Sequence, residues 1–160
     1  MKVKVKSLVN GTVGIKDPDL RINRTWSKKG AVYSFEMEDL EQLMYDPGTE
    51  YMFREGILAV VGDNAKEINI QLGLQDEDEP EKMFDFTDEK KKEIMAMKMA
   101  DFRKVVKELT HEQQHMLVEY CVDNKIRDYD RDMFLKDLTH IDILKAIELD
   151  EQDKEEVKEA

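Results

Sequence analysis

The first third of the chain alternates hydrophobic with polar residues, and this pattern predicts β-strands. Val3 and Val5 alternate with lysines at the start of the chain. The pair Asn10-Gly11 that follows favours a type I′ turn, so we expect a hairpin there. A short apolar run over 57–61 contains β-branched residues and predicts a central strand. Strands are therefore expected over 3–8, 13–15, 20–26, 31–35 and 57–61.

From residue 37 onward the hydrophobic residues recur with a spacing near 3.6, which predicts short helices over 37–45, 49–55 and 65–72. After residue 86 the helical spacing continues to residue 149. Residues that commonly begin helices precede these segments, and Thr110 with Gln113 fits a capping box. We expect helix starts at Thr49, Thr87, Thr110, Asp130 and Thr139.

These elements predict an α+β protein in which a small strand-rich α/β unit precedes a C-terminal α-helical bundle. The expected boundaries are an α+β unit over 1–74, an acidic linker over 75–82, a helical unit over 83–149 and an acidic tail over 150–160. The linker is expected because its consecutive acidic residues and Pro80 disfavour regular structure.

Charge is distributed unevenly along this pattern. The 160 residues carry a formal net charge of −12, yet residues 1–30 carry +6 and residues 76–160 carry −11. Such a distribution bears on partners and solubility. We expect the basic strand edge and its single tryptophan to contact a partner, through Lys2, Lys4, Arg21, Arg24, Trp26, Lys28 and Lys29.

The partner of this basic edge is expected to be a protein, either an acidic neighbour or the acidic half of another copy of the chain. Basic residues and a tryptophan can also bind nucleic acid, but the strongly acidic second half would repel a polyanion. Nucleic acid is therefore the less favoured partner.

The sharpest chemical motif is His111-Glu112-Gln113-Gln114-His115, which satisfies the pattern H-E-x-x-H. Two histidines four residues apart on a helix can bind one zinc ion while the glutamate acts as a base, as in a metallopeptidase. However, no third histidine follows at the spacing of extended zinc motifs. We therefore expect a solvated helix face, no cofactor and no enzyme activity, with a zinc peptidase as the alternative.

Other features limit the class of protein. No run of 18 apolar residues occurs, so no membrane span is expected. The first residues lack the apolar core of a signal peptide, so secretion by that route is not expected. The single cysteine, Cys121, cannot form an intramolecular disulfide and is expected to be buried.

Three segments, 29–35, 45–58 and 142–149, resemble stretches of small, uncharacterised proteins from tailed bacteriophages of Gram-positive hosts. The resemblance rests on turn and core residues, so it transfers no functional residue. It implies a phage setting and nothing finer. Within that setting we expect a non-enzymatic structural or accessory protein that binds a capsid, neck or tail component, in the host cytoplasm during assembly and then in the virion. The alternative within this setting is a soluble assembly chaperone or an acidic inhibitor of a host nucleic-acid enzyme.

Overall fold

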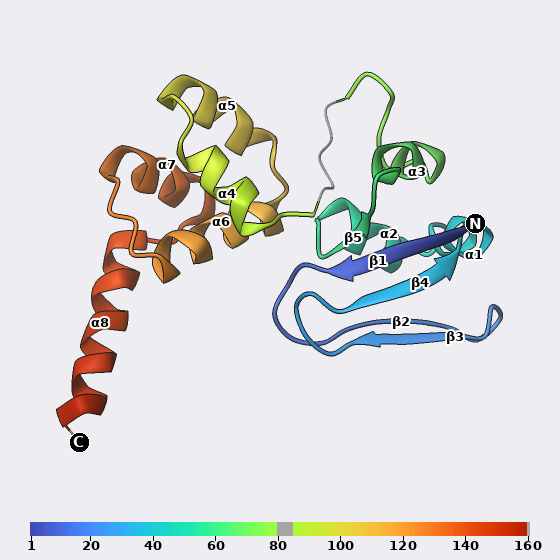
Figure 1. Cartoon of the computed structure of the whole chain (residues 1–160), viewed down its shortest axis with the longest axis horizontal. Helices are drawn as coiled ribbons and strands as arrows, with labels where there is room; N and C mark the ends of the chain where they lie inside the picture. The colour runs from blue at the N-terminus through green and yellow to red at the C-terminus, as the bar shows by residue number, and fades with distance from the viewer. Residues whose placement is uncertain (80–84, 160) are drawn as a thin grey trace. The chain divides into compact units, whose positions relative to one another are not determined.

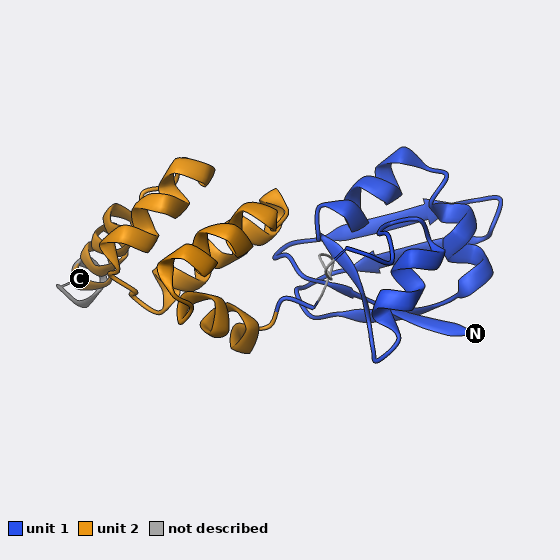
Figure 2. Ribbon diagram, turned by 90° about the horizontal axis from the view of Figure 1, so that it is seen from above, with its two compact units in different colours: residues 1–86 blue, residues 87–160 orange. Residues whose placement is uncertain are grey.

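The computed structural model describes residues 1–79 and 85–159, and it confirms the α+β class with C-terminal helices. The chain divides into two compact units, Met1–Phe86 and Thr87–Ala160, which we call unit 1 and unit 2 (Figure 2). The sequence placed this boundary at an acidic linker over 75–82 followed by a helical unit from 83. In the structure, Gln75 and Phe86 are buried and belong to unit 1, while residues 80–84 lie outside the described part.

Unit 1 is built on a three-stranded antiparallel sheet in the order β4-β1-β5. The central strand is β1 (Lys2–Ser7), which pairs with β4 (Val32–Glu36) on one side and β5 (Leu58–Val61) on the other (Figure 1). Residues 57–61 were predicted to form a central strand, but β5 pairs only with β1 among the described strands. The N-terminal strand, with its alternating valines, occupies the centre instead.

The remaining two strands, β2 (Val13–Asp17) and β3 (Ile22–Trp26), form a separate hairpin. The turn expected at Asn10-Gly11 therefore does not join paired strands, because β1 uses both of its edges for β4 and β5. The hairpin turn lies at residues 18–21, where the Asp17 carboxylate accepts the backbone N–H groups of Asp19 and Leu20.

Three helices complete unit 1: α1 (Met37–Leu43), α2 (Pro47–Arg54) and α3 (Ala65–Gln71). Sheet, hairpin and helices share one hydrophobic core. Its large members come from every element and include Val5, Trp26, Phe35, Leu40, Phe53, Leu58 and Ile68.

Unit 2 is a helical bundle of α4 (Asp88–Met95), α5 (Met99–Glu108), α6 (His111–Asp123), α7 (Tyr129–Thr139) and α8 (Ile143–Glu159). Phe102, Val106, Leu117, Leu135 and Ile147 are almost completely buried. The predicted tail over 150–160 is not a separate segment, because α8 continues through Glu159. None of the helices in the described ranges could cross a membrane.

The helix starts test the capping predictions individually. Thr110 and Gln113 form the expected capping box, and Thr87 caps α4. At α2, however, Asp46 caps the helix and Pro47 takes its first position, where the missing N–H costs nothing. Asp128 caps α7 in place of Asp130.

The prediction at Thr139 is wrong because this residue is the last of α7. His140 follows it in the left-handed conformation, and the carboxylate of Asp142 accepts the N–H of Lys145 at the start of α8. The repeated Leu-Thr-His sequence thus begins one helix and ends another.

Candidate protein-binding surface

The basic residues of β1 lie on the side of the sheet that faces away from the core. Val3 and Val5 are buried, while Lys2 and Lys4 are exposed and Lys6 is half-buried. Alternation along the strand puts all three lysines on one face. The neighbouring strands add residues to this face according to the register, and we call the whole set the lysine face: Lys2, Lys4, Lys6, Val32, Ser34, Glu36, Ala59 and Val61.

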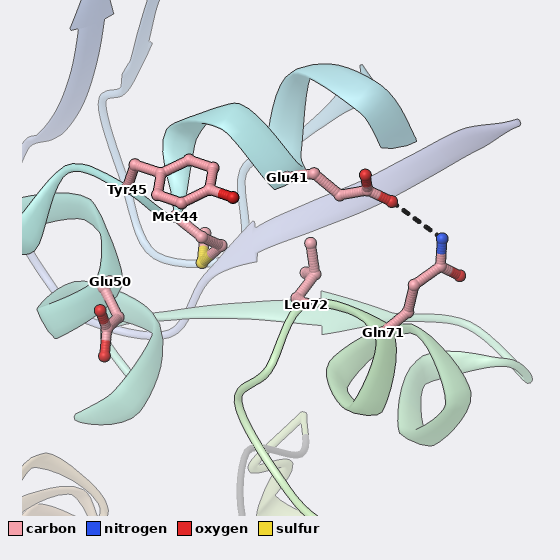
Figure 3. A pocket seen from close by; sticks show the side chains of 6 residues that line it. All are labelled: Glu41, Met44, Tyr45, Glu50, Gln71 and Leu72. Atoms are coloured by element: carbon pink, nitrogen blue, oxygen red, sulfur yellow. Dashed lines mark hydrogen bonds between the residues drawn. The ribbon is translucent and has the colours of Figure 1, made fainter.

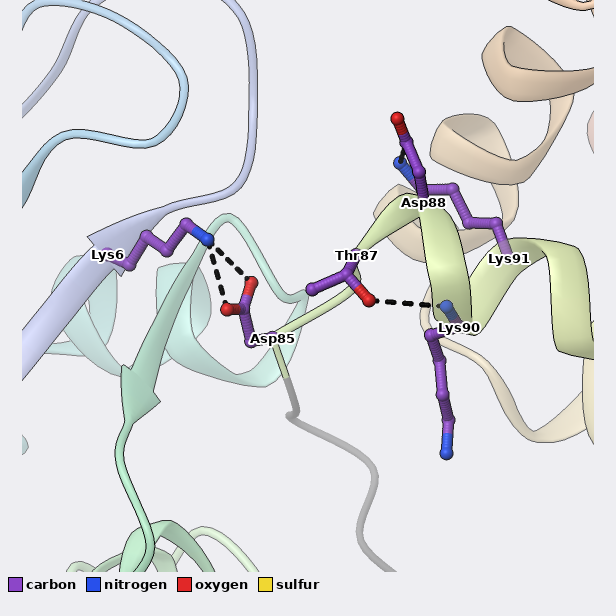
Figure 4. Close-up of polar contacts among 6 residues, drawn as sticks. All are labelled: Lys6, Asp85, Thr87, Asp88, Lys90 and Lys91. Atoms are coloured by element: carbon purple, nitrogen blue, oxygen red, sulfur yellow. Dashed lines mark hydrogen bonds and ion pairs between the residues drawn. The ribbon is translucent and has the colours of Figure 1, made fainter.

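Two lysines of this face already bind carboxylates. Lys2 lies opposite Glu36 on β4, with Nζ 2.9 Å from Oε1, and this contact lowers the pKa of Glu36. Lys6 donates to both oxygens of Asp85 at 3.0 Å (Figure 4). Ala59, the cross-strand neighbour of Lys6, and Phe86, the residue after Asp85, are both buried. The Lys6 end of the lysine face is therefore covered on its β5 side, while Val32, opposite Lys6 on β4, stays exposed.

Lys4 lies in the middle of the lysine face and differs from its neighbours. It is exposed, and no ion pair joins it to any residue in the described part of the chain. Its cross-strand neighbours are Ser34, which is exposed, and Val61, which is half-buried. Val32, which lies opposite Lys6 on β4 and diagonal to Lys4, keeps 45% of its surface exposed. This part of the face therefore combines a cation with apolar and hydroxyl surface.

The other predicted contact cations lie on a different side of unit 1. Arg21 lies in the β2–β3 turn and Arg24 on β3, while Lys28 and Lys29 lie in the loop between β3 and β4. All four are exposed, and we call them the hairpin cations.

The hairpin packs against the core-facing side of the sheet, because Trp26 stacks on Phe35 and meets Tyr33 edge-on. Those two aromatic residues lie opposite Val3 and Val5, which point into the core. The lysine face points away from that core. The basic residues expected to form one edge are thus divided between the outer side of the sheet and the hairpin with the loop that follows it.

Trp26 contributes to neither surface. Its side chain has no exposed area, and its indole N–H donates to the Val5 carbonyl oxygen at 3.1 Å. The prediction that Trp26 contacts a partner is therefore wrong. Its basic neighbours in the sequence suggested a surface position, but Ile22 and Trp26 are the two core-facing residues of β3.

The H-E-x-x-H motif occupies the start of α6. His111 and His115 are exposed, whereas the two residues between them, Gln113 and Gln114, are buried. Gln113 completes the capping box and Gln114 donates to the Val106 carbonyl oxygen at 3.0 Å. Across the described ranges, no three histidine, cysteine, aspartate or glutamate side chains are grouped to hold a metal ion. The helix therefore turns both histidines toward solvent, without a third ligand.

A polar hollow of about 580 Å³ lies between α1, α2 and α3 of unit 1 (Figure 3). It is lined by Glu41, Met44, Tyr45, Glu50, Gln71 and Leu72. Both carboxylates have partners, because Glu41 accepts from Gln71 at 2.8 Å and Glu50 pairs with Arg54. The sequence did not predict this hollow, because it depends on how three helices pack together and no local pattern specifies that packing.

Unit 2 contains a buried carboxyl group that the sequence also did not reveal. Asp132 is 2% exposed, and burial, aided by the nearby Asp128 and Asp142 charges, raises its pKa to about 6. One carboxyl oxygen accepts the backbone N–H of Asp128 at 3.2 Å, and the other has no partner in the described ranges.

The same environment affects the single cysteine. Burial raises the pKa of the Cys121 thiol to about 12, and the charges of Asp132 and Asp128 add to the effect. The expectation of a buried thiol is confirmed.

No protein-family model, no curated protein and no solved structure matches the chain. The candidate surfaces are therefore judged on their own chemistry.

Proposed function

We propose that this chain is a non-enzymatic structural or accessory protein of a phage, and that it binds a capsid, neck or tail protein through a basic surface of unit 1. The observation that carries this proposal is Lys4, which is exposed, forms no ion pair with any described residue and lies near the exposed side chain of Val32. A charged residue among apolar neighbours favours a protein partner, because interfaces combine both kinds of contact. The phage setting rests on the sequence resemblance alone.

The uneven charge supports binding of an acidic partner over an uncharged one. Unit 1 concentrates its cations in residues 1–30, which carry +6. Complementary charge speeds association and selects partners, and its effect decreases as salt increases. Binding through this surface should therefore weaken at high ionic strength.

The proposal is tested by incorporation of the chain into phage particles. Mass spectrometry of purified particles should find the wild-type chain at a fixed copy number. A variant with Lys4, Lys28 and Lys29 changed to Glu reverses the charge of one exposed lysine on the lysine face and of two hairpin cations. We expect this variant to be absent from the particles. A chain that is absent from wild-type particles would contradict the structural role and would favour the soluble chaperone or inhibitor.

A further inference from the structure

We propose that the lysine face is the docking site, and that its occupant is an acidic segment of a partner protein in extended conformation. This inference rests on the proposed function and makes it more specific. It chooses one of the two basic surfaces of unit 1, and it states the conformation and charge pattern of the partner.

The first argument is a contact within the chain itself. Residues 85–87 form no helix or strand, and the carboxylate of Asp85 binds the Lys6 ammonium with both oxygens at 3.0 Å (Figure 4). Phe86 is buried directly after it. A non-helical segment thus already binds at one end of this face through an acidic residue. The middle of the face, around Lys4, offers the same chemistry to a partner.

The second argument is spacing. Lys2, Lys4 and Lys6 occupy every second position of one strand, so successive lysines lie about 7 Å apart. An extended segment repeats its side chains over the same distance on each of its faces. Carboxylates at alternate positions can therefore reach Lys4 and Lys2, whose side chain stays 70% exposed beside Glu36, while Lys6 is held by Asp85. A helix cannot match it as well, because its side chains recur at three and four residues.

The third argument is the chemistry around Lys4. Val32 is 45% exposed, and Val61 is half-buried beside Lys4. The lysine stems add apolar surface of their own. Such a surface fits a peptide that carries small apolar residues between its acidic ones. Glu36 lies within the same face and would repel phosphates and carboxylates alike, so the apolar surface of Val32 and Val61 is what favours a peptide over a nucleic acid.

The hairpin offers a matched control. Lys16 is also an exposed lysine on a strand, lies opposite Asn23, and has no ion pair to any described residue of the chain. Reversing its charge changes the net charge of unit 1 by as much as reversing Lys4. The Lys16 reversal leaves the lysine face unchanged. It therefore distinguishes binding at that face from non-specific electrostatic attraction between the peptide and unit 1.

The test uses the full chain and two fluorescent peptides of about ten residues, long enough to span a strand. One peptide alternates Glu with Val or Thr. The other has the same composition but carries its glutamates consecutively. Fluorescence anisotropy at low salt measures both affinities for the wild type and for the Lys4→Glu, Lys4→Gln and Lys16→Glu variants. Circular dichroism checks that each variant is folded. If Lys4→Glu does not fold, Lys4→Gln takes its place as the test variant.

We expect the alternating peptide to bind the wild type more tightly than the peptide with consecutive glutamates. Lys4→Glu should weaken that binding by about tenfold or more, Lys4→Gln by less, and Lys16→Glu by no more than about twofold. Equal weakening by the Lys4 and Lys16 reversals would overturn the inference, as would equal affinity for the two peptides. Tighter binding of single-stranded oligothymidylate would overturn it in favour of nucleic acid.

Failure here is distinguishable from failure of the proposed function. If the peptides do not bind but the chain is still incorporated into particles through its basic residues, only the choice of the lysine face is wrong. If incorporation also fails, the proposed function falls with it.

Discussion

At the scale of single residues, Trp26 is a buried core residue although the residues around it in the sequence are basic. It is the only tryptophan in the chain, it is completely buried, and it bonds to the Val5 carbonyl of the central strand. Its ring joins the hairpin to the sheet by packing on Tyr33 and Phe35. A residue in this position stabilises unit 1 and cannot bind a partner.

This placement makes Trp26 a direct spectroscopic probe. We expect blue-shifted fluorescence that acrylamide quenches poorly in the folded protein and efficiently in denaturant. Trp26→Phe keeps an aromatic ring but loses the hydrogen bond to Val5, so it should lower the free energy of unfolding by about 1–3 kcal/mol. Emission typical of water-exposed indole in the native protein would contradict the buried position.

Asp132 predicts a pH dependence of the stability of unit 2. Its folded pKa, about 6, lies above the value of about 3.9 expected in an unfolded chain. The folded state therefore binds the proton more tightly. The stabilisation this provides is fully present below about pH 4 and is lost as the pH rises through 6.

The variant Asp132→Asn removes the buried charge and should raise the free energy of unfolding at pH 7 by about 1–3 kcal/mol. Its advantage over the wild type should shrink toward pH 4. Urea unfolding at several pH values, followed through the helical signal, measures both effects. Parallel pH profiles for the two proteins would show that Asp132 is not the responsible group.

At the scale of elements, local signals located most strands and helices but did not determine their partners. The alternation around Val3 and Val5 correctly indicated a strand, and the capping box at Thr110 correctly indicated a helix start. The pairing of β1 with β4 and β5 depends on contacts between residues far apart in sequence, so the local turn signal at Asn10-Gly11 was misleading. The ion pair between Lys6 and Asp85 joins residues 79 positions apart, so local sequence patterns could not predict it either.

The start of α6 offers a test that separates a structural from a metal-binding role. Thr110→Ala removes the side-chain oxygen that accepts the Gln113 N–H at 3.1 Å. We expect it to lower the free energy of unfolding by about 1 kcal/mol.

His111→Ala, one residue later and exposed, should change that free energy by less than about 0.5 kcal/mol. Added zinc should not raise the melting temperature of the wild type. A zinc-dependent rise that His111→Ala abolishes would support the metal-site alternative instead.

The last helix should be stable over only part of its length. Ile143 and Ile147 bury its first two turns, whereas Leu149 is 52% exposed and residues 152–155 are exposed. A helix without packing is marginal in water. Amide hydrogen exchange should therefore be slow over 143–148 and much faster beyond residue 152. Equal protection along α8 in the isolated protein would mean that its second half packs against another surface.

At the scale of the whole molecule, the chain consists of two units with separate cores. The sequence predicted two units on either side of an acidic linker over 75–82, whereas the boundary in the structure follows Phe86. Charge predicted that residues 1–30 carry the exposed cations. It could not predict that the fold separates them onto two surfaces, because that depends on which side of the sheet the hairpin packs.

Separate cores predict separate responses to mutation. Trp26→Ala should destabilise unit 1 by about 3–5 kcal/mol and leave the helices of unit 2 folded at the same temperature. Thermal unfolding of this variant should show two transitions, and the helical signal should persist through the first. A single transition shifted to lower temperature would show that the two units unfold as one.

The most direct test of the central claim is to locate the bound acidic peptide by backbone amide chemical shifts of the full chain. Binding at the lysine face should shift residues of β1 together with their neighbours in β4 and β5, and the shifts should disappear in Lys4→Glu. Shifts confined to the hairpin and residues 28–29, or no shifts at all, would contradict the account.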